Sequence, residues 1–231
     1  MKTNFFDFLS APALVKQHEE DRFIFTCANF LKNKYNVNED AAYAIAHCLF
    51  ARMNDARLHY HTPIHVLSLF DFADDYQIHL QNHDKLAIWF HDAIYEINSA
   101  ECRNETSSVD FMIALLQDYL DYNDYIKAAY IIEDTTMHLE PLKHNSSDLV
   151  LDLDLSNFAY NREMHNVANQ AVRKEYSQYS DQQFATGRLN FLKKFLNKGF
   201  IYRTPLFKDQ FETIALTNIE EDIKECQRIL T

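Results

Sequence analysis

The sequence contains very little glycine and proline. Only two glycines and four prolines occur in 231 residues. Hairpins and sandwiches need many turns in which glycine adopts positive φ angles, so this scarcity excludes a sheet-rich fold. It also excludes a glycine-rich phosphate-binding loop, and with it a nucleotide mechanism of the P-loop type. The chain is therefore expected to consist of helices joined by short connections.

Cysteine is also scarce, and its four positions lie in separate segments. Neither a CxxC pair nor the dense framework of a disulfide-rich domain is present. We expect Cys27, Cys48, Cys102 and Cys226 to be reduced thiols that pack mostly as small apolar side chains. The sequence has no signal-peptide pattern and no uncharged apolar stretch of membrane-spanning length, which predicts a cytoplasmic protein without a membrane partner.

Positive charge is in short supply. Lysine and arginine total 22 against 34 acidic residues, which gives a formal net charge of −12. The densest basic cluster is Lys193, Lys194 and Lys198, and its spacing predicts one solvated helix face. The negative net charge repels polyanions, so we expect no nucleic-acid polymer as a partner. The 13 tyrosines and 18 phenylalanines provide for a full core and would allow a homodimer.

Helix-start signals and apolar spacing divide the chain into helical segments. Thr62-Pro63, Thr204-Pro205 and Ser10-Ala11-Pro12 each combine a capping hydroxyl with a proline suited to the first helical turn. The long helix expected at Pro205–Ile229 has a candidate break near Thr217-Asn218. No linker or repeat interrupts the pattern, so we expect one all-α domain over residues 1–231. The nine earlier helices are expected at Ala11–Lys34, Glu39–Asn54, Pro63–Tyr76, Asp84–Tyr95, Glu105–Tyr119, Asp124–His138, Asp148–Tyr160, Arg162–Gln178 and Gln182–Asn197.

Histidine and aspartate occur at selected points of otherwise apolar segments. His61 lies just before the proline that opens one predicted helix, and His65 lies in the first turn of that helix. His91 and Asp92 close a segment that is apolar on all sides, and Asp154 lies within a second such segment. Buried polar groups need strong partners, which a shared metal ion supplies. Imidazole and carboxylate suit a divalent Mn, Fe, Zn, Co, Ni or Mg ion, which can activate water for hydrolysis.

Each of these residues alone is weak evidence for a metal site. The chain has 11 histidines, so a pair spaced four apart is expected by chance, and most single histidines are ordinary core or surface residues. The joint order is what favours the metal site. It places HxxxH at a capped helix start, a His-Asp pair at the end of a buried helix, and an aspartate inside another buried segment.

The same order of residues resembles the HD superfamily of metal-dependent phosphohydrolases. The segments Arg57–His65 and Leu86–Tyr95, with the shorter Asn104-Glu105 and Asp152–Leu155, resemble a bacterial branch of predicted HD phosphohydrolases. The resemblance runs from about Arg57 to the final helix and implies an HD-type helical bundle with extra C-terminal helices. Short segments of the C-terminal half that also resemble this branch are Arg173–Tyr176, Gly187-Arg188 and Ile201–Thr204.

The resemblance implies a role for each residue of the pattern. His65, His91, Asp92 and Asp154 would bind one or two divalent ions, and Asp92 would bridge two of them. The opening is also similar to cyclic nucleotide phosphodiesterases, in which a YHxxxH segment provides a general acid followed by a metal ligand. His61 would then protonate the leaving group, because an imidazolium can protonate a departing alkoxide near neutral pH.

Two further residues have alternative interpretations. Many two-metal HD proteins carry extra histidines between the His-Asp pair and the last aspartate, which makes His138 a second-metal ligand; the alternative is a histidine that complements a helix dipole. Glu105 matches the branch and would orient a water molecule or a ligand histidine during catalysis. It fits equally well a carboxylate in a first helical turn. Glu96 is a weaker candidate of the same kind.

A phosphorylated substrate also needs cations. Arg57, Arg173, Arg188 and Arg203 lie in the segments that resemble the family, and arginine suits bidentate contact with phosphate. Most exposed arginines are only solvated, so one or two of the four are expected to bind substrate. Arg57 is the first choice because it lies one helical turn before the ligand segment.

The sequence therefore predicts a metal-dependent phosphohydrolase that acts on a small phosphomonoester or nucleotide through metal-activated water. Two alternatives use the same scaffold. One is a di-iron oxygenase of the HD type, which requires two irons and an additional histidine ligand. The other is a non-catalytic nucleotide-sensing or interaction module with a vestigial metal site.

Overall fold

The computed structural model describes residues 13–99, 103–136, 138 and 148–231, with side chains described from residue 17 onward. Within these ranges the chain forms ten α-helices and one 3₁₀ helix, and no strand occurs there, so the predicted all-α fold is confirmed. The elements are α2 (Ala13–Tyr35), α3 (Glu39–Met53), α4 (Pro63–Asp75), α5 (Asn82–Phe90), α6 (Arg103–Leu116), α7 (Tyr122–Thr135), α8 (Asp148–Asp154), η1 (Ser156–Ala159), α9 (Arg162–Glu175), α10 (Asp181–Lys198) and α11 (Pro205–Leu230).

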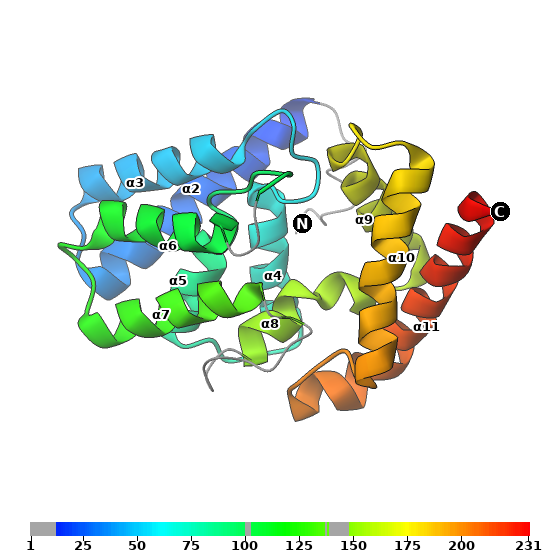
Figure 1. Ribbon diagram of the computed structural model, residues 1–231. Helices are drawn as coiled ribbons and strands as arrows, with labels where there is room; N and C mark the ends of the chain where they lie inside the picture. Colours follow the sequence, from blue (N-terminus) through cyan, green and yellow to red (C-terminus); the bar gives the residue numbers. More distant parts are fainter. Residues whose placement is uncertain (1–12, 100–102, 137, 139–147) are drawn as a thin grey trace.

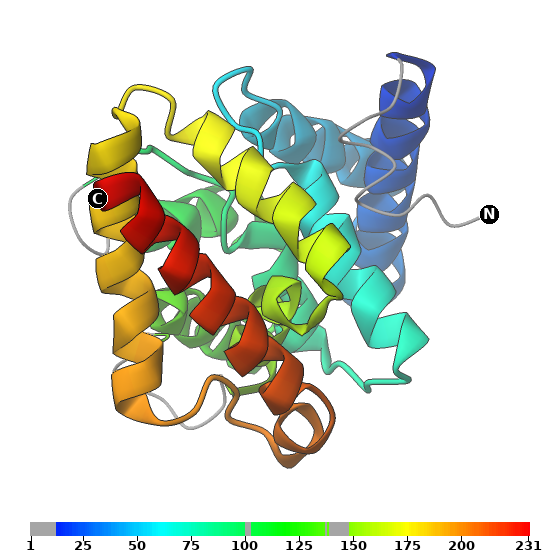
Figure 2. The same cartoon turned by 90° about the vertical axis from the view of Figure 1, so that its right-hand side faces the viewer.

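The helices form two groups that are joined by α8 and η1. In Figure 1, α2 to α7 lie on one side of the molecule and α9 to α11 on the other. α2 packs along α3, α5 packs against α7, and α10 packs along α11, as the yellow-orange and red helices of Figure 2 show. α8 contacts α4, α5 and α7, whereas η1 contacts α9 and α11. The short segment 148–159 therefore connects the two groups.

Most helix ends follow from local capping. α4 begins at Pro63, as predicted from the Thr62-Pro63 pair, although the Thr62 side chain makes no capping hydrogen bond. Thr204 does cap α11, because its hydroxyl accepts a hydrogen bond from the Phe207 N–H. α10 ends at Lys198 and is capped by Gly199, whose φ of 83° lies in the left-handed region that glycine adopts most easily.

Several helices differ from the sequence-based expectation. The final helix is not broken near Asn218, because the side chain of Asn218 points inward and donates to the carbonyls of Phe158 (3.0 Å) and Tyr160 (2.8 Å). It therefore does not compete for the backbone of its own helix. α5 ends at Phe90, so the His-Asp pair follows the helix, and α8 ends at Asp154 before a separate 3₁₀ turn. Ser10-Ala11-Pro12 and Cys102 lie outside the described residues.

The core is rich in aromatic side chains. Trp89 of α5 is fully buried and packs edge-on against Phe23 of α2, with 5.0 Å between ring centroids. Phe72 of α4 stacks on Phe207 of α11 at 5.5 Å, so one hydrophobic cluster includes both groups of helices. The assignment of the whole chain to a single domain stays a prediction.

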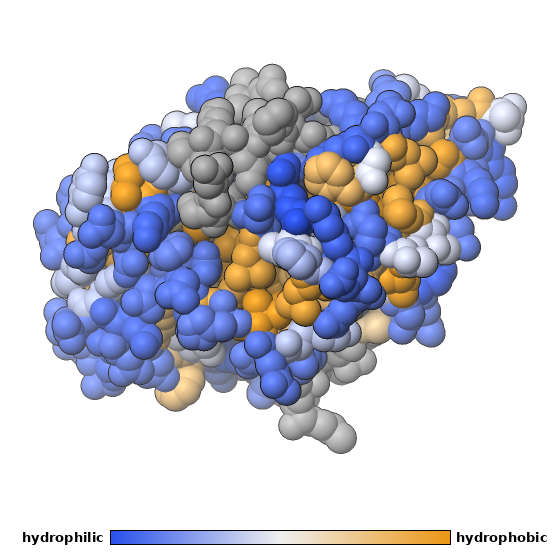
Figure 3. Space-filling view, turned by 90° about the horizontal axis from the view of Figure 1, so that it is seen from below, coloured by the Kyte–Doolittle hydropathy of each residue, from blue (hydrophilic) through white to orange (hydrophobic). Residues whose placement is uncertain are grey.

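Figure 3 shows a face dominated by polar residues, with smaller hydrophobic areas between them. Phe25 on α2 is 59% exposed, and Tyr122 at the start of α7 is 70% exposed. Among the helices that the structure describes, none is long and apolar enough to cross a membrane. The cysteines Cys27 and Cys226 are buried free thiols, whereas Cys48 is exposed.

Candidate metal centre

His65 is fixed by the first turn of α4. It follows the proline that opens the helix, and its ring is buried. Its Nε2 lies 2.9 Å from Oδ1 of Asp154, the last residue of α8. The contact between α4 and α8 therefore brings together two residues that are 89 positions apart in the chain.

His91 and Asp92 follow directly after the buried helix α5. The N–H of His91 still donates to the carbonyl of Ala87 at 2.8 Å, so the residue is held as if the helix continued. Its Nδ1–H donates to the carbonyl of Ile88 at 3.0 Å. That hydrogen bond fixes the tautomer in which Nε2 carries a lone pair. This Nε2 faces the cluster, 3.0 Å from Oδ2 of Asp92 and 3.4 Å from Nε2 of His65.

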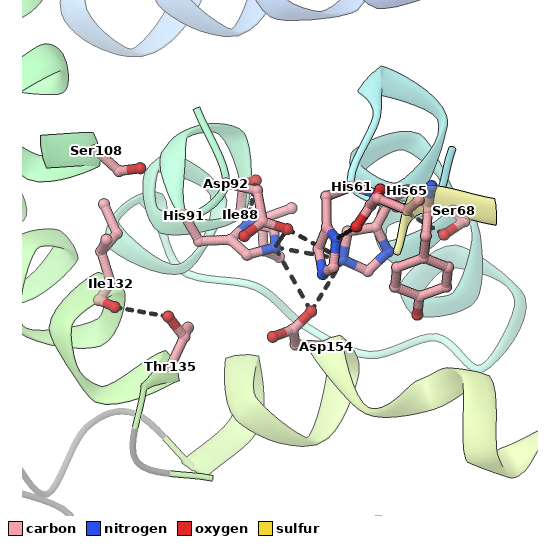
Figure 4. A network of polar contacts seen from close by, with 12 residues as sticks. His61, His65, Ser68, Ile88, His91, Asp92, Ser108, Ile132, Thr135 and Asp154 are labelled. Atoms are coloured by element: carbon pink, nitrogen blue, oxygen red, sulfur yellow. Dashed lines mark hydrogen bonds and ion pairs between the residues drawn. The ribbon is translucent and has the colours of Figure 1, made fainter. Parts of the chain in front are cut away.

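Four side chains thus converge on one point. His65, His91, Asp92 and Asp154 each offer one ligand atom, and these atoms all lie within 4.8 Å of one another. Figure 4 shows Asp154 facing the two imidazoles from the side opposite Asp92. Two imidazole nitrogens and two carboxylates are a donor set that suits a divalent first-row metal or Mg²⁺. The predicted ligands are therefore positioned together, and the residues present fit a metal ion.

The charges of the cluster depend strongly on one another. Burial alone would lower the pKa of His91, but the carboxylates of Asp92 and Asp154 raise it well above its usual value. Burial would likewise raise the pKa of Asp154, and His91, His138 and His65 reverse that effect and lower it. Protonated imidazole thus balances the buried carboxylates, a task that a divalent cation would take over.

His138 and Glu105 border the same cluster. Nε2 of His138 lies 3.0 Å from Oδ2 of Asp154, the oxygen that does not face His65. Its Nδ1 is buried and has no hydrogen-bond partner in the described chain. The backbone carbonyl of His138 is held by Lys198 Nζ at 2.9 Å and by Arg203 at 3.2 Å. His138 lies just beyond the end of α7, so the helix predicted to extend to His138 ends at Thr135.

Glu105 lies in the first turn of α6 and lines the cavity beside Asp92. Burial, together with the negative charge of Asp92, raises the pKa of its carboxyl group. Glu96 lies elsewhere, since its exposed carboxylate pairs with Arg57 at 3.5 Å. The position of Glu105 fits both interpretations. It is a carboxylate in a first helical turn, and it also lines the cavity beside the metal ligands.

His61 is held by a buried carboxylate. Its Nδ1–H donates to Oε1 of Glu175 at 2.5 Å. The other oxygen of Glu175 accepts the backbone N–H groups of His59, Tyr60 and His61 at 3.0, 2.9 and 3.1 Å. The imidazole of His61 also stacks on the ring of Tyr95, with 3.7 Å between centroids. Its ring plane is therefore fixed, and Nε2 is left for the cavity.

The charges around His61 favour its protonated form. Burial alone would lower its pKa, but Glu175 and Asp92 raise it above the ordinary value. Burial would raise the pKa of Glu175, and His61 and the backbone N–H groups lower it instead. Glu175 was missed by the sequence reasoning, although it lies inside the family-like segment Arg173–Tyr176.

The four arginines occupy different environments. Arg188 of α10 lines the cavity beside the cluster. Arg57 lines a neighbouring cavity and pairs with Asp55 at 2.7 Å. Arg173 binds Asp181 at 2.8 Å and the carbonyls of Tyr176 and Tyr179. Arg203 holds the carbonyl of His138. The structure thus does not bring Arg57, the first choice, or Arg173 and Arg203 into this cavity.

Asp92 and Asp154 of the cluster line a cavity of about 550 Å³. Such a volume is typical of small-molecule sites. The wall opposite the metal ligands comes from α9, α10 and the turn between them, and its residues are mostly aromatic or apolar. The aromatic residues of the lining are Tyr60, Tyr95, Phe158, Tyr176, Tyr179, Phe184 and Phe191.

No family model and no curated protein sequence matches the chain. Among solved structures, the chain is similar to the phosphodiesterase domain of the RhoPDE fusion protein from the choanoflagellate Salpingoeca rosetta, a crystal structure. The TM-score is 0.56 at 11% sequence identity, and the match covers 91% of each chain. At this identity the likeness shows a shared fold. The chain thus has the helical architecture of a phosphodiesterase domain and a His/Asp cluster that could hold a metal ion.

Proposed function

We propose that the chain is a metal-dependent phosphohydrolase that acts on a small phosphomonoester or nucleotide. The observation that carries the proposal is the convergence of His65, His91, Asp92 and Asp154, whose ligand atoms lie within 4.8 Å of one another, with Asp92 and Asp154 lining a substrate-sized cavity. A divalent cation held by these side chains lowers the pKa of a coordinated water and neutralises charge on a phosphoryl group. The fold shared with a phosphodiesterase domain supports this reaction class.

His61 supplies the proton in this proposal. Its Nδ1–H is bound by Glu175, so in the protonated ring Nε2–H points away from that carboxylate. A phosphate ester in the cavity would present its leaving oxygen to this N–H, and the proton would move from Nε2 to that oxygen as the P–O bond breaks. Stacking on Tyr95 keeps the ring in place during the transfer.

His138 extends the proposal to two ions. Its Nε2 approaches the oxygen of Asp154 that does not face His65, so Asp154 could serve two positions at once. Glu105, next to Asp92 in the cavity wall, is placed to accept a proton from water or to orient it. The number of ions and the metal identity stay predictions, as do the small phosphorylated partner and a homodimer.

Elemental analysis of protein purified without chelators is the first test. We expect one or two equivalents of Mn, Fe, Zn, Co or Ni, or stimulation by added Mg²⁺ or Mn²⁺, together with phosphate release from a panel of phosphate esters. Asp92→Ala should abolish both, and His138→Ala should lower the metal content without abolishing it. Glu96→Ala is the matched control, because this exposed carboxylate lies outside the cavity. Hydrolysis that survives in Asp92→Ala would overturn the proposal.

A di-iron oxygenase is the second candidate function. The observation that favours it is the position of His138 beside Asp154, because a second iron needs an additional histidine. Two equivalents of iron, a mixed-valent signal in electron paramagnetic resonance and oxygen consumption without phosphate release would support this function in place of the first.

A further inference from the structure

Arg188 is the one arginine or lysine among the described residues that line the cavity of the metal centre. It projects from α10, and its side chain is 15% exposed. The guanidinium lies over the rings of Phe191 and Phe158, with 5.5 and 5.8 Å to the centroids. The cavity wall therefore combines candidate metal ligands with the partly buried guanidinium of Arg188.

An amide contacts the guanidinium at hydrogen-bond distance, and the carboxylate of Asp222 is a more distant ion-pair partner at 3.9 Å. Nη2 of Arg188 donates to Oδ1 of Asn169 at 3.0 Å. The Nδ2 group of Asn169 in turn donates to Oδ2 of Asp222 at 2.8 Å. Because the amide donates with its nitrogen, its oxygen must face Arg188, so Asp222 fixes the orientation of the amide.

The carboxylate of Asp222 is already shared among other groups. It binds Arg162 at 2.8 Å and Nε2 of His165 at 2.9 Å, and its distance to Arg188 is 3.9 Å. In the described part of the chain, the guanidinium of Arg188 makes a single hydrogen bond, which goes to Asn169. A partly buried guanidinium whose one hydrogen bond goes to a neutral amide, and whose ion-pair carboxylate is 3.9 Å away, is incompletely compensated, which favours an anion in the cavity. Its remaining N–H groups are available for such an anion.

In the described chain, Arg188 forms no ion pair with a candidate metal ligand. The ion pairs of Arg188 in the described chain involve Asp222, and neither Asp92 nor Asp154 is among its partners. Tyr60, whose ring centroid is 5.0 Å from that of His65, lines the same cavity as Arg188. This arrangement is compatible with an anion at Arg188 that is distinct from the phosphoryl group at the metal centre.

We propose that Arg188 binds a second anionic group of the substrate, a carboxylate or a second phosphate, and that Asn169 is the positioning residue for this contact. The substrate class is then a phosphate ester that carries a second anionic group within the reach of one cavity. This inference rests on the proposed phosphohydrolase function. It assigns binding to Arg188 and leaves the chemical step to the metal centre and His61.

Matched substrate pairs test the proposal on the metal-loaded protein. Phosphoglycolate is compared with ethyl phosphate, and a nucleoside 3′,5′-bisphosphate with the nucleoside 3′-phosphate. We expect wild type to prefer the member with two anionic groups by at least tenfold in kcat/KM. In Arg188→Met the preference should disappear through a rise in KM, with kcat changed by less than about threefold, because uniform binding energy is what is lost.

Three variants distinguish a substrate-binding role of Arg188 from a purely structural role. Arg188→Lys should restore part of the preference, because the charge returns without the fork geometry. Asn169→Leu alone should weaken the preference. Combined with Arg188→Met it should cause no further loss, as a double-mutant cycle requires for two residues that act together. Arg57→Met is the matched control, since this exposed arginine lines the neighbouring cavity.

The outcomes distinguish the inference from the function on which it rests. Turnover of both members of each pair without a preference, or a preference that survives in Arg188→Met, would overturn the inference and leave the hydrolase intact. If no member is hydrolysed with any metal, the proposed function fails. Calorimetric titration of the same pairs then decides the inference alone, and equal binding of both members by wild type would overturn it.

Discussion

Glu175 shows how one buried carboxylate can serve both the backbone and a catalytic side chain. Burying a carboxylate without partners is costly, and here three backbone N–H groups and an imidazole supply them. The three N–H groups belong to the segment that precedes α4. The same contact therefore holds the entry to α4 and the ring of His61 in one arrangement.

The charge of Glu175 should set the pH range of activity. A general acid works below its own pKa and fails above it, and Glu175 and Asp92 raise the pKa of His61 against the effect of burial. In Glu175→Gln the charge is lost and the pKa of His61 falls. We expect the alkaline limb of the kcat profile to move to lower pH, with kcat at neutral pH reduced on the order of 10²-fold or less.

The measurement is kcat against pH for wild type, Glu175→Gln and Glu96→Gln. The last variant removes an exposed carboxylate outside the cavity and should leave the profile in place. An alkaline limb that stays where it is in Glu175→Gln would show that His61 is not the acid whose protonation limits the reaction.

At the residue scale the sequence supports some assignments and not others. The positions of His65, His91, Asp92 and Asp154 could be anticipated because polar residues in apolar segments need a common partner. Glu175 could not, since nothing local marks a glutamate at the end of an amphipathic helix as a partner for residues 114 to 116 positions earlier. The preference for Arg57 was based on nearness in sequence, and the fold directs that side chain to Asp55.

At the scale of helices, the starts were more predictable than the ends. A start depends on local signals, such as the hydroxyl and proline at α11 or the Ser180-Gln183 capping box of α10. The end of α5 has no glycine or proline, and apolar residues continue past Phe90 in the sequence. The absence of a break in α11 depends on the long-range hydrogen bonds of Asn218, which the sequence does not reveal.

The two glycines belong to the same stretch and should respond in opposite ways to alanine. Gly199 has a φ of 83° and Gly187 lies within α10, and a Cβ at either position meets nothing within 4 Å. Steric contacts of the added Cβ with neighbouring residues therefore do not account for a difference between the two variants. Gly199→Ala should lower the free energy of unfolding by about 1–2 kcal/mol, because alanine resists the left-handed region. Gly187→Ala should raise it by about 0.5–1 kcal/mol.

Urea unfolding followed by circular dichroism measures both changes. Equal effects of the two substitutions would contradict the assignment of Gly199 as a left-handed helix terminus. Because Gly187 lines the cavity, the same variant also tests whether a methyl group there obstructs substrate, through KM.

For the whole molecule, metal binding should be coupled to stability. The four candidate ligands come from α4, from the turn after α5 and from α8, so an ion would tie together segments that are far apart in the chain. A ligand that binds only the folded state at 100 times its Kd stabilises that state by about 2.7 kcal/mol. We therefore expect Mn²⁺ to raise the Tm of the apo-protein by roughly 5–10 °C.

Differential scanning calorimetry with increasing Mn²⁺ provides the measurement. His91→Ala is the control, because it removes one ligand and should lose the metal-dependent rise in Tm. A rise of equal size in His91→Ala would place the ion elsewhere on this acidic protein, whose net charge is −12.

All four candidate metal ligands precede residue 155, whereas Glu175 and Arg188 come from α9 and α10. The residues that would hold the ion therefore precede, in the chain, the residues of α9 and α10 that line the same cavity. Substitutions at lining positions of α10, such as Arg188, can change the cavity while the ion-holding side chains stay untouched. α9 lacks this freedom, because its Glu175 also holds His61 and the entry to α4.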